Sequence, residues 1–209
     1  EPDVLVSDIL TLAPALAAFQ ARHPQLQVEL RFTARRVDLL REDVDLAFRV
    51  TEQPPQDCIA QPVLRFAVRA YAAPHAKARL RDPHALARAR CLVFGSSSEA
   101  QPLVWRSDDG RERASVEVRP TMSADDIGTL LAAARAGGGV VFAPDFAVRD
   151  DLARGTLVEA LPGWQLPIPE GATVQALPLP LAVAPEAARA LVRFVREARH
   201  GIETFGDAA

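Results

Sequence analysis

Apolar and polar residues follow their clearest order between residues 123 and 144. The spacing of the apolar residues predicts an amphipathic helix whose buried face carries Ile127, Leu130, Leu131 and Ala134. Ser123 or Asp125 is the expected N-cap, because their side-chain oxygens accept amides of the first turn. Gly137–Gly139 stop the helix where positive φ is needed, and Val140–Phe142 form a short buried strand. The glycines follow the helix, so this is not a phosphate-binding loop.

A similar pattern opens the chain and predicts strand–helix–strand–helix–strand over residues 4–48. Leu12, Leu16 and Phe19 share one face of the first helix, which stops near His23-Pro24. This order is typical of a parallel sheet with crossover helices. The remaining expected elements are the strands Val4–Val6, Gln27–Phe32 and Asp45–Phe48 and a short helix over Arg35–Glu42.

The middle and end of the chain alternate between strand and helix patterns. Val63–Tyr71 predicts one long strand with Leu64, Phe66, Val68 and Ala70 on one side. Ser107–Gly110 is a turn signal between two strands of a hairpin, Leu103–Trp105 and Ser115–Val118. Further strands are expected at Cys91–Phe94 and Thr156–Ala160, and helices near Pro83–Ala89, Ala147–Arg154 and Pro185–Arg199.

This order predicts an α/β fold of two Rossmann-like subdomains joined by two crossover strands. The crossings are expected near Arg65–Tyr71 and Ala172–Leu179. Subdomain I would then be discontinuous, formed by residues 1–68 and 175–209, and subdomain II would comprise residues 69–174. Ligands in such sheets collect at the carboxyl ends of the strands.

The composition of the chain excludes several classes of function. The 209 residues are 49% hydrophobic with a formal net charge of −3, which supports a real core and argues against a polyanion-binding surface. Cys58 and Cys91 belong to no metal-binding motif; two ordinary thiols or a disulfide remain open. The four histidines are expected at the surface, and neither a metal nor a cofactor is predicted. The sequence has no run of 18 apolar residues that would predict a membrane span.

Catalysis finds no support in the motifs. Gly95–Ser98 is not the GxSxG elbow of hydrolases, and no histidine is placed to activate a serine. The adjacent acids Asp108-Asp109, Asp125-Asp126 and Asp150-Asp151 mark turns or helix starts. Neighbouring residues on a helix point in different directions, so such pairs do not cooperate as acid and base. We therefore expect no catalytic residues and no enzyme.

Several segments resemble the C-terminal effector-binding (regulatory) domain of LysR-type transcriptional regulators. Their order and spacing carry the resemblance, and the branch that responds to aromatic acids is the most similar. The segments are LAPALAAFQARHPQLQVEL at 12–30, RRVDLLREDVDLAFRV at 35–50, AVRAYAAP at 67–74, LARARCLVF at 86–94, VWRSDDGRERASVEV at 104–118, ADDIGTLLAAARAGGGVVFAPDFAVRDDLARGTLVEALPGW at 124–164 and APEAARALVRFVRE at 184–197.

The resemblance implies a fold like that of type 2 periplasmic binding proteins, with an effector in the cleft between subdomains. It also implies a cytoplasmic protein, a homodimer within a tetramer, and control of promoter DNA through an N-terminal helix-turn-helix that is not in this sequence. Apolar helix faces at Leu12–Phe19 and Ile127–Ala134 are the expected dimer surfaces. The alternative is a periplasmic solute-binding protein of an uptake system, which shares the implied fold and cleft.

The candidate effector contacts lie at strand ends and helix starts. Hydroxyls and free amides there favour a small carboxylate or aromatic acid, and Arg49 is a natural counter-ion. Asp8 would repel an anion and select a hydroxyl or amine instead. Each of these residues also fits a purely structural role, as a helix cap, a turn residue or a surface residue. The predicted effector-binding residues are Ser7, Asp8, Thr33, Arg35, Arg49, Gly95, Ser96, Ser97, Ser98, Ser123, Ala124, Asp125 and Pro144.

Overall fold

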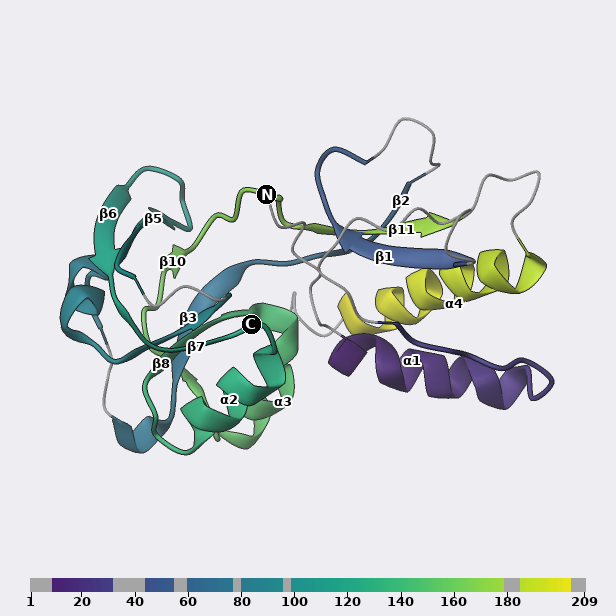
Figure 1. Ribbon diagram of the computed structural model, residues 1–209, viewed down its shortest axis with the longest axis horizontal. Coiled ribbons are helices and arrows are strands. Elements are labelled where there is room, and N and C mark those ends of the chain that lie inside the picture. Colours follow the sequence, from purple (N-terminus) through teal and green to yellow (C-terminus); the bar gives the residue numbers. More distant parts are fainter. Residues whose placement is uncertain are drawn as a thin grey trace. The chain divides into compact units, whose positions relative to one another are not determined.

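The computed structural model of the chain describes residues 9–31, 44–54, 60–76, 80–95, 99–178 and 185–203. The chain divides into two compact units (Figure 1). Unit 1 comprises Glu1–Arg65 and Pro169–Ala209, and unit 2 comprises Phe66–Ile168. Unit 1 is therefore discontinuous in sequence and unit 2 is continuous. The assignment of functional subdomains to 1–68 with 175–209 and to 69–174 stays a prediction.

Unit 2 is built on a five-stranded mixed sheet of order β7-β4-β8-β3-β9. The strands are β3 (Val68–Ala72), β4 (Cys91–Phe94), β7 (Pro120–Ala124), β8 (Val140–Pro144) and β9 (Val158–Glu159). β4 runs parallel to β7 and β8, whereas β3 runs antiparallel to β8 and β9. Parallel strands need crossover connections, and helices provide them here.

Alternating side chains of this sheet bury two separate cores. Tyr71, Leu92 and Val141 point to one face, where they pack against the apolar stripe of α2 (Ile127–Arg135). Ile127, Leu130, Leu131 and Ala134 of that stripe are all buried, so the helical spacing read from the sequence is confirmed. α3 (Arg149–Arg154) lies beside α2 in Figure 1, and the 3-10 turn η3 (Asp145–Val148) precedes it.

A small antiparallel sheet contributes to the second core. It has the order β10-β5-β6, with β5 (Gln101–Ser107), β6 (Arg113–Val118) and β10 (Trp164–Gln165). Trp105 of β5 is fully buried and meets Phe142 of β8 edge to face, with ring centroids 5.2 Å apart. Two further 3-10 turns, η1 (Pro74–Ala76) and η2 (Pro83–Arg88), precede β4, and Leu86 of η2 joins this core.

In its described residues, unit 1 combines two helices with a three-stranded sheet of order β1-β11-β2. The elements are α1 (Ile9–Arg22), α4 (Glu186–Glu203), β1 (Leu46–Val50), β2 (Gln61–Arg65) and β11 (Thr173–Pro178). Phe19 of α1 packs against Phe194 of α4, with ring centroids 5.6 Å apart. Val63 and Ala176 of the sheet form a core with Val192 and Val195 of α4.

Several predicted elements are confirmed with small shifts of their ends. These are the first helix, the strand at Cys91–Phe94, the hairpin around Ser107–Gly110, the helix from Ile127, the strand from Val140 and the last helix. In each, a strong local pattern is bounded by a clear turn or cap signal. Within the described residues, no helix is long and apolar enough to cross a membrane.

Other predictions about strands are wrong. The strand expected over Gln27–Phe32 is absent from residues 27–31, and Phe32 and Val4–Val6 lie outside the described residues. Both described strand pairs of unit 1 are antiparallel, because β11 returns from the far end of the chain to lie between β1 and β2. The long strand expected over Val63–Tyr71 is two strands, since the chain leaves one sheet after Arg65 and enters another at Val68.

Candidate functional site

Three parallel strands of unit 2 end at one edge of the sheet, and the described candidate residues gather there. Gly95 follows β4, Asp125 follows β7, and Pro144 ends β8. Phe94 and Ala124 are register partners, and the Gly95 amide donates to the Ala124 carbonyl over 2.8 Å. This bond joins the ends of two strands. The effector contacts predicted for these residues stay a prediction.

The backbone at Gly95 has a conformation that favours glycine. Its φ of +116° lies in a region that side chains with a Cβ rarely adopt. A Cβ built at Gly95 would meet nothing within 4 Å, so the limit on this position is backbone conformation and not packing. Ser96, Ser97 and Ser98, which follow, lie outside the described residues.

The start of α2 differs from the expectation in one important respect. Asp126 is the N-cap, and its carboxylate accepts from the Thr129 amide at 2.9 Å and from the Thr129 hydroxyl at 3.0 Å. These hydrogen bonds lower the pKa of Asp126. The capping role predicted for Ser123 or Asp125 is wrong, because Ser123 still belongs to β7 and Asp125 comes one residue too early. One amide of the helix start is thus already occupied.

Asp145 is a residue at this edge that the sequence analysis did not single out. It follows Pro144 directly, and its amide donates to the carbonyl of Ala67 over 2.9 Å. Burial raises the pKa of its carboxyl, while backbone hydrogen bonds from Ala67 and Phe146 and the charges of Arg69 and Arg149 lower it; the balance is a raised pKa. Its position three residues beyond the predicted strand Val140–Phe142 was the available signal.

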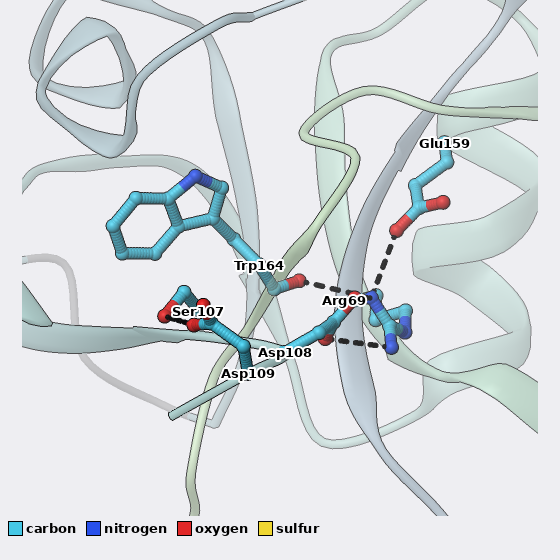
Figure 2. A network of polar contacts seen from close by, with 6 residues as sticks. All are labelled: Arg69, Ser107, Asp108, Asp109, Glu159 and Trp164. Carbon is cyan, nitrogen blue, oxygen red and sulfur yellow. Dashed lines mark hydrogen bonds and ion pairs between the residues drawn. The ribbon is translucent and has the colours of Figure 1, made fainter. Parts of the chain in front are cut away.

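A charged network stands between the two sheets of unit 2 (Figure 2). The Arg69 guanidinium of β3 binds both carboxylate oxygens of Asp108 at 2.9 and 3.0 Å and reaches Glu159 at 3.1 Å. The same group donates to the Trp164 carbonyl at 3.4 Å. Burial lowers the pKa of Arg69, but the hydrogen bonds and charges of Asp108 and Glu159 outweigh it and leave the pKa raised. The network ties the hairpin turn and two short strands to β3.

The candidate residues of unit 1 are described only in part. Arg49 lies in β1 opposite Gln175 of β11 and is buried, with 9% of its surface exposed. Ser7, Asp8, Thr33 and Arg35 lie outside the described residues. The effector contacts predicted for them, and for the serines after Gly95, remain predictions.

Two other chemistries find no support in the described part of the chain. The residues that the structure covers include no group of three or more His, Cys, Asp or Glu side chains that could hold a metal ion. Cys91 is a free, buried thiol whose Sγ donates to the Leu86 carbonyl at 3.5 Å. Burial raises its pKa to about 11, so the reactive thiolate is scarce near neutral pH.

The helix faces that were expected to form a dimer are buried within their own units. Leu16 and Phe19 of α1 are 6% and 2% exposed, and the apolar stripe of α2 is 0–4% exposed. These faces already cover the cores of their own units. The argument for dimerisation from spare apolar surface is therefore wrong, although dimerisation itself is a separate question.

Comparison with known proteins identifies the family. Residues 7–199 match the family model of the LysR substrate binding domain. The regulator PtxR of Pseudomonas aeruginosa PAO1 is 34% identical over 154 residues, which are 72% of this chain and 49% of PtxR. The activator TtdR of Escherichia coli K12 is 28% identical over 156 residues, 73% of this chain and 50% of TtdR. The chain thus spans about half the length of these curated relatives.

Solved structures show the same fold. The regulatory domain of CrgA from Neisseria meningitidis superposes with a TM-score of 0.75 at 23% identity, covering 91% of this chain and 93% of that one. Full-length AphB of Vibrio cholerae gives 0.74 at 22% identity, covering 94% of this chain and 66% of AphB. Both are described as members of the LysR-type family. The chain is therefore a member of the LysR substrate binding domain family, the effector-binding domain of LysR-type transcriptional regulators.

Proposed function

We propose that this domain controls transcription by binding a small-molecule effector at the carboxyl edge of β4, β7 and β8. The observation that carries the proposal is the joining of two strand ends by the Gly95–Ala124 hydrogen bond beside the start of α2. Edges of this kind are where α/β sheets bind ligands. Gly95, Ser123, Ala124, Asp125 and Pro144 are the proposed contacts in unit 2, and Ser96–Ser98 extend them.

The charges at this edge bear on the class of effector. Asp125 is exposed and Asp145 is half-buried, so a simple anion meets two carboxyls there. A carboxylate or aromatic acid that also carries a hydroxyl or amine matches both the free amides and the acids. This agrees with the effect expected of Asp8. We place such hydroxy and amino acids first in a screen, with plain aromatic acids next.

The proposed partners follow from the family. We infer a homodimer that assembles into a tetramer in a longer protein, and promoter DNA bound by a helix-turn-helix domain of that protein in the cytoplasm. The relatives are named as transcriptional regulators, which supports a regulator over a solute-binding protein and over an enzyme. The coding sequence upstream of this domain distinguishes the two proposals. A helix-turn-helix there would support the regulator, and a signal peptide would support the solute-binding protein.

A thermal-shift screen of small hydroxy, amino and aromatic acids tests the site, because a ligand that binds only the native state raises its stability. Titration of a hit should then show weaker affinity in Ser97→Ala and in Arg49→Ala, with folding retained. Ser115→Ala, an exposed serine in β6 of the small sheet, is the matched control and should bind normally. Unchanged affinity in both test variants would place the ligand elsewhere.

A further inference from the structure

The amino ends of the parallel strands of unit 2 form an edge that is separate from the candidate effector edge. Cys91 of β4 is the register partner of Pro120 of β7 and of Val140 of β8. The three strands therefore start together, at the opposite edge of the sheet from Gly95 and Pro144. The 4 residues of β4 separate the two edges by roughly 13 Å, because a parallel strand rises about 3.3 Å per residue.

The backbone is held tightly at this amino edge, where the triple glycine of the sequence ends. A Cβ built at Gly139 would overlap the Arg90 carbonyl, so only glycine allows the two segments to approach this closely. The Val140 amide donates to the same carbonyl over 2.7 Å. The Thr121 hydroxyl donates to the Cys91 carbonyl at 3.1 Å. The backbone of Arg90 is therefore fixed in place as the chain enters β4.

Arginine residues gather at the same edge. Arg90 precedes β4 and Arg119 precedes β7, so the register pair of Cys91 and Pro120 sets them at the start of neighbouring strands. Arg88 ends η2, two residues before Arg90. All three arginines are exposed. Neighbouring strands lie about 4.8 Å apart, so side chains that start there can contact the same stretch of a polyanion.

These three arginines have no acidic partner of their own. Within the described part of the chain, neither a hydrogen bond nor an ion pair holds the side chain of Arg88, Arg90 or Arg119. The Asp82 carboxylate, at the other end of η2, accepts from the His84 amide at 2.6 Å. Several other arginines of unit 2 are paired with acids, namely Arg69, Arg111, Arg135 and Arg154.

We propose that Arg88, Arg90 and Arg119 form a phosphate-binding surface that contacts the backbone of promoter DNA. The planar guanidinium group binds two phosphate oxygens at once, and such contacts do not depend on base sequence. The inference rests on the proposed function, because the helix-turn-helix domain of the longer protein brings DNA within reach. Tethering raises the effective concentration of DNA, so a weak contact still contributes to the affinity of the whole protein.

The net charge of the chain limits the strength of this surface. A net charge of −3 repels DNA from the domain as a whole, and the exposed Glu117 offsets part of the local positive charge. The isolated domain should therefore bind DNA weakly, without sequence preference and only at low salt. The composition argues against a polyanion-binding surface over the whole chain, and the proposed surface is confined to one edge of one sheet.

Fluorescence anisotropy of a short labelled DNA duplex with the isolated domain tests the surface across a series of salt concentrations. In the Arg90→Gln/Arg119→Gln double variant, the slope of log affinity against log salt should fall by about 1.8, since each phosphate contact contributes about 0.9. The matched control is Arg111→Gln/Arg154→Gln, which changes the net charge equally but removes arginines that pair with Asp109 and Asp150. It should keep the wild-type slope. Thermal unfolding checks that both variants fold.

Three results would overturn the surface. They are a wild-type domain that binds no duplex even at low salt, an equal fall of the slope in both double variants, and polyglutamate that binds through the same arginines as tightly as DNA does. The last result would assign the surface to an acidic protein.

The same variants in the longer protein separate this inference from the proposed function. The test variant should lower the salt slope for promoter DNA by the same amount and leave the protected bases unchanged. A longer protein that binds no promoter DNA would contradict the proposed function, whereas promoter binding with an unchanged slope would contradict only the arginine surface.

Discussion

Asp145 begins η3 and Asp151 lies within α3, the next element of the chain. Their surroundings shift their pKa values in opposite directions. Asp151 is 2% exposed and is held by Arg135 Nε at 2.7 Å, Arg135 Nη2 at 2.8 Å and the Thr156 hydroxyl at 2.6 Å. The hydrogen bonds from Arg135 are the main reason that its pKa is lowered. Asp145 has burial as its largest influence, and its pKa is raised. Burial alone therefore does not decide the charge of a carboxyl; the donors around it do.

The two acids make opposite contributions to the pH dependence of stability. A lowered pKa in the folded state means that Asp151 stabilises the fold above its usual pKa and that this contribution is lost as pH falls through the folded value. A raised pKa means that the Asp145 contribution is fully present below its usual pKa and is lost as pH rises through the folded value. The first term favours neutral pH and the second favours acid.

Removing Asp151 should have the largest effect. Asp151→Ala leaves Arg135 without its bidentate partner and removes the shorter of the two hydrogen bonds that the Thr156 hydroxyl donates to residue 151. We expect the free energy of unfolding to fall by about 2–3 kcal/mol, below the 3–5 kcal/mol of a fully buried pair because the Arg135 side chain is 40% exposed. Urea denaturation at pH 7 measures this. A loss no greater than that of Asp150→Ala would show that the pair contributes nothing beyond a surface contact.

A variant of Asp126 measures what hydrogen bonds to an exposed carboxylate contribute to stability. Its carboxylate accepts from Thr129 as Asp151 accepts from its donors, but the side chain is exposed. Asp126→Ala should therefore cost only about 1 kcal/mol, the usual loss for an N-cap. Asp126→Ser keeps a capping oxygen and should recover most of it. A matching loss in Asp125→Ala would contradict the assignment of the cap to Asp126.

Local patterns predicted the elements whose formation is decided within about twenty residues. The stripe of α2 and the turn at Ser107–Gly110 carry their own signals. β7 was missed because Pro120–Ala124 has no apolar alternation; it is a strand because β4 pairs with it. β10 was missed in the same way, since its partner β5 lies about sixty residues earlier in the chain.

The candidate site was predictable only where it follows strand ends. Gly95, Ala124 and Pro144 follow or end strands that run parallel in one sheet, which is why they lie at one edge. Asp145 was not singled out, because its environment comes from Ala67 and Arg69, which are distant in sequence. No local pattern contains such long-range contacts. Whether these residues bind an effector is the question for the screen.

Asp145→Asn should reveal the smaller, opposite pH effect. Above the folded pKa of Asp145 the amide removes a desolvated charge, so the stability difference between variant and wild type should favour the variant as pH rises. Below the usual pKa the difference should shrink, because wild-type Asp145 is then protonated in both states. Thermal unfolding between pH 3 and pH 8, on the order of one measurement per pH unit, follows this trend. If Asp145→Asn lost stability relative to the wild type as pH rises, the assigned sign would be reversed.

Asp150→Ala should have the smallest effect and sets the scale for the others. Asp150 pairs with Arg154 one turn along α3 at 3.6 Å, with the two side chains 85% and 66% exposed. Water screens such a pair, so its loss should cost only about 0.3–0.5 kcal/mol and should fade as salt is added. Asp150 precedes Asp151 in the sequence, yet only Asp151 faces Arg135 and Thr156. Urea denaturation of both variants at low and high salt therefore compares adjacent acids of one helix. A large, salt-insensitive loss in Asp150→Ala would mean that position on α3, and not the Arg135 contact, governs the effect of removing Asp151.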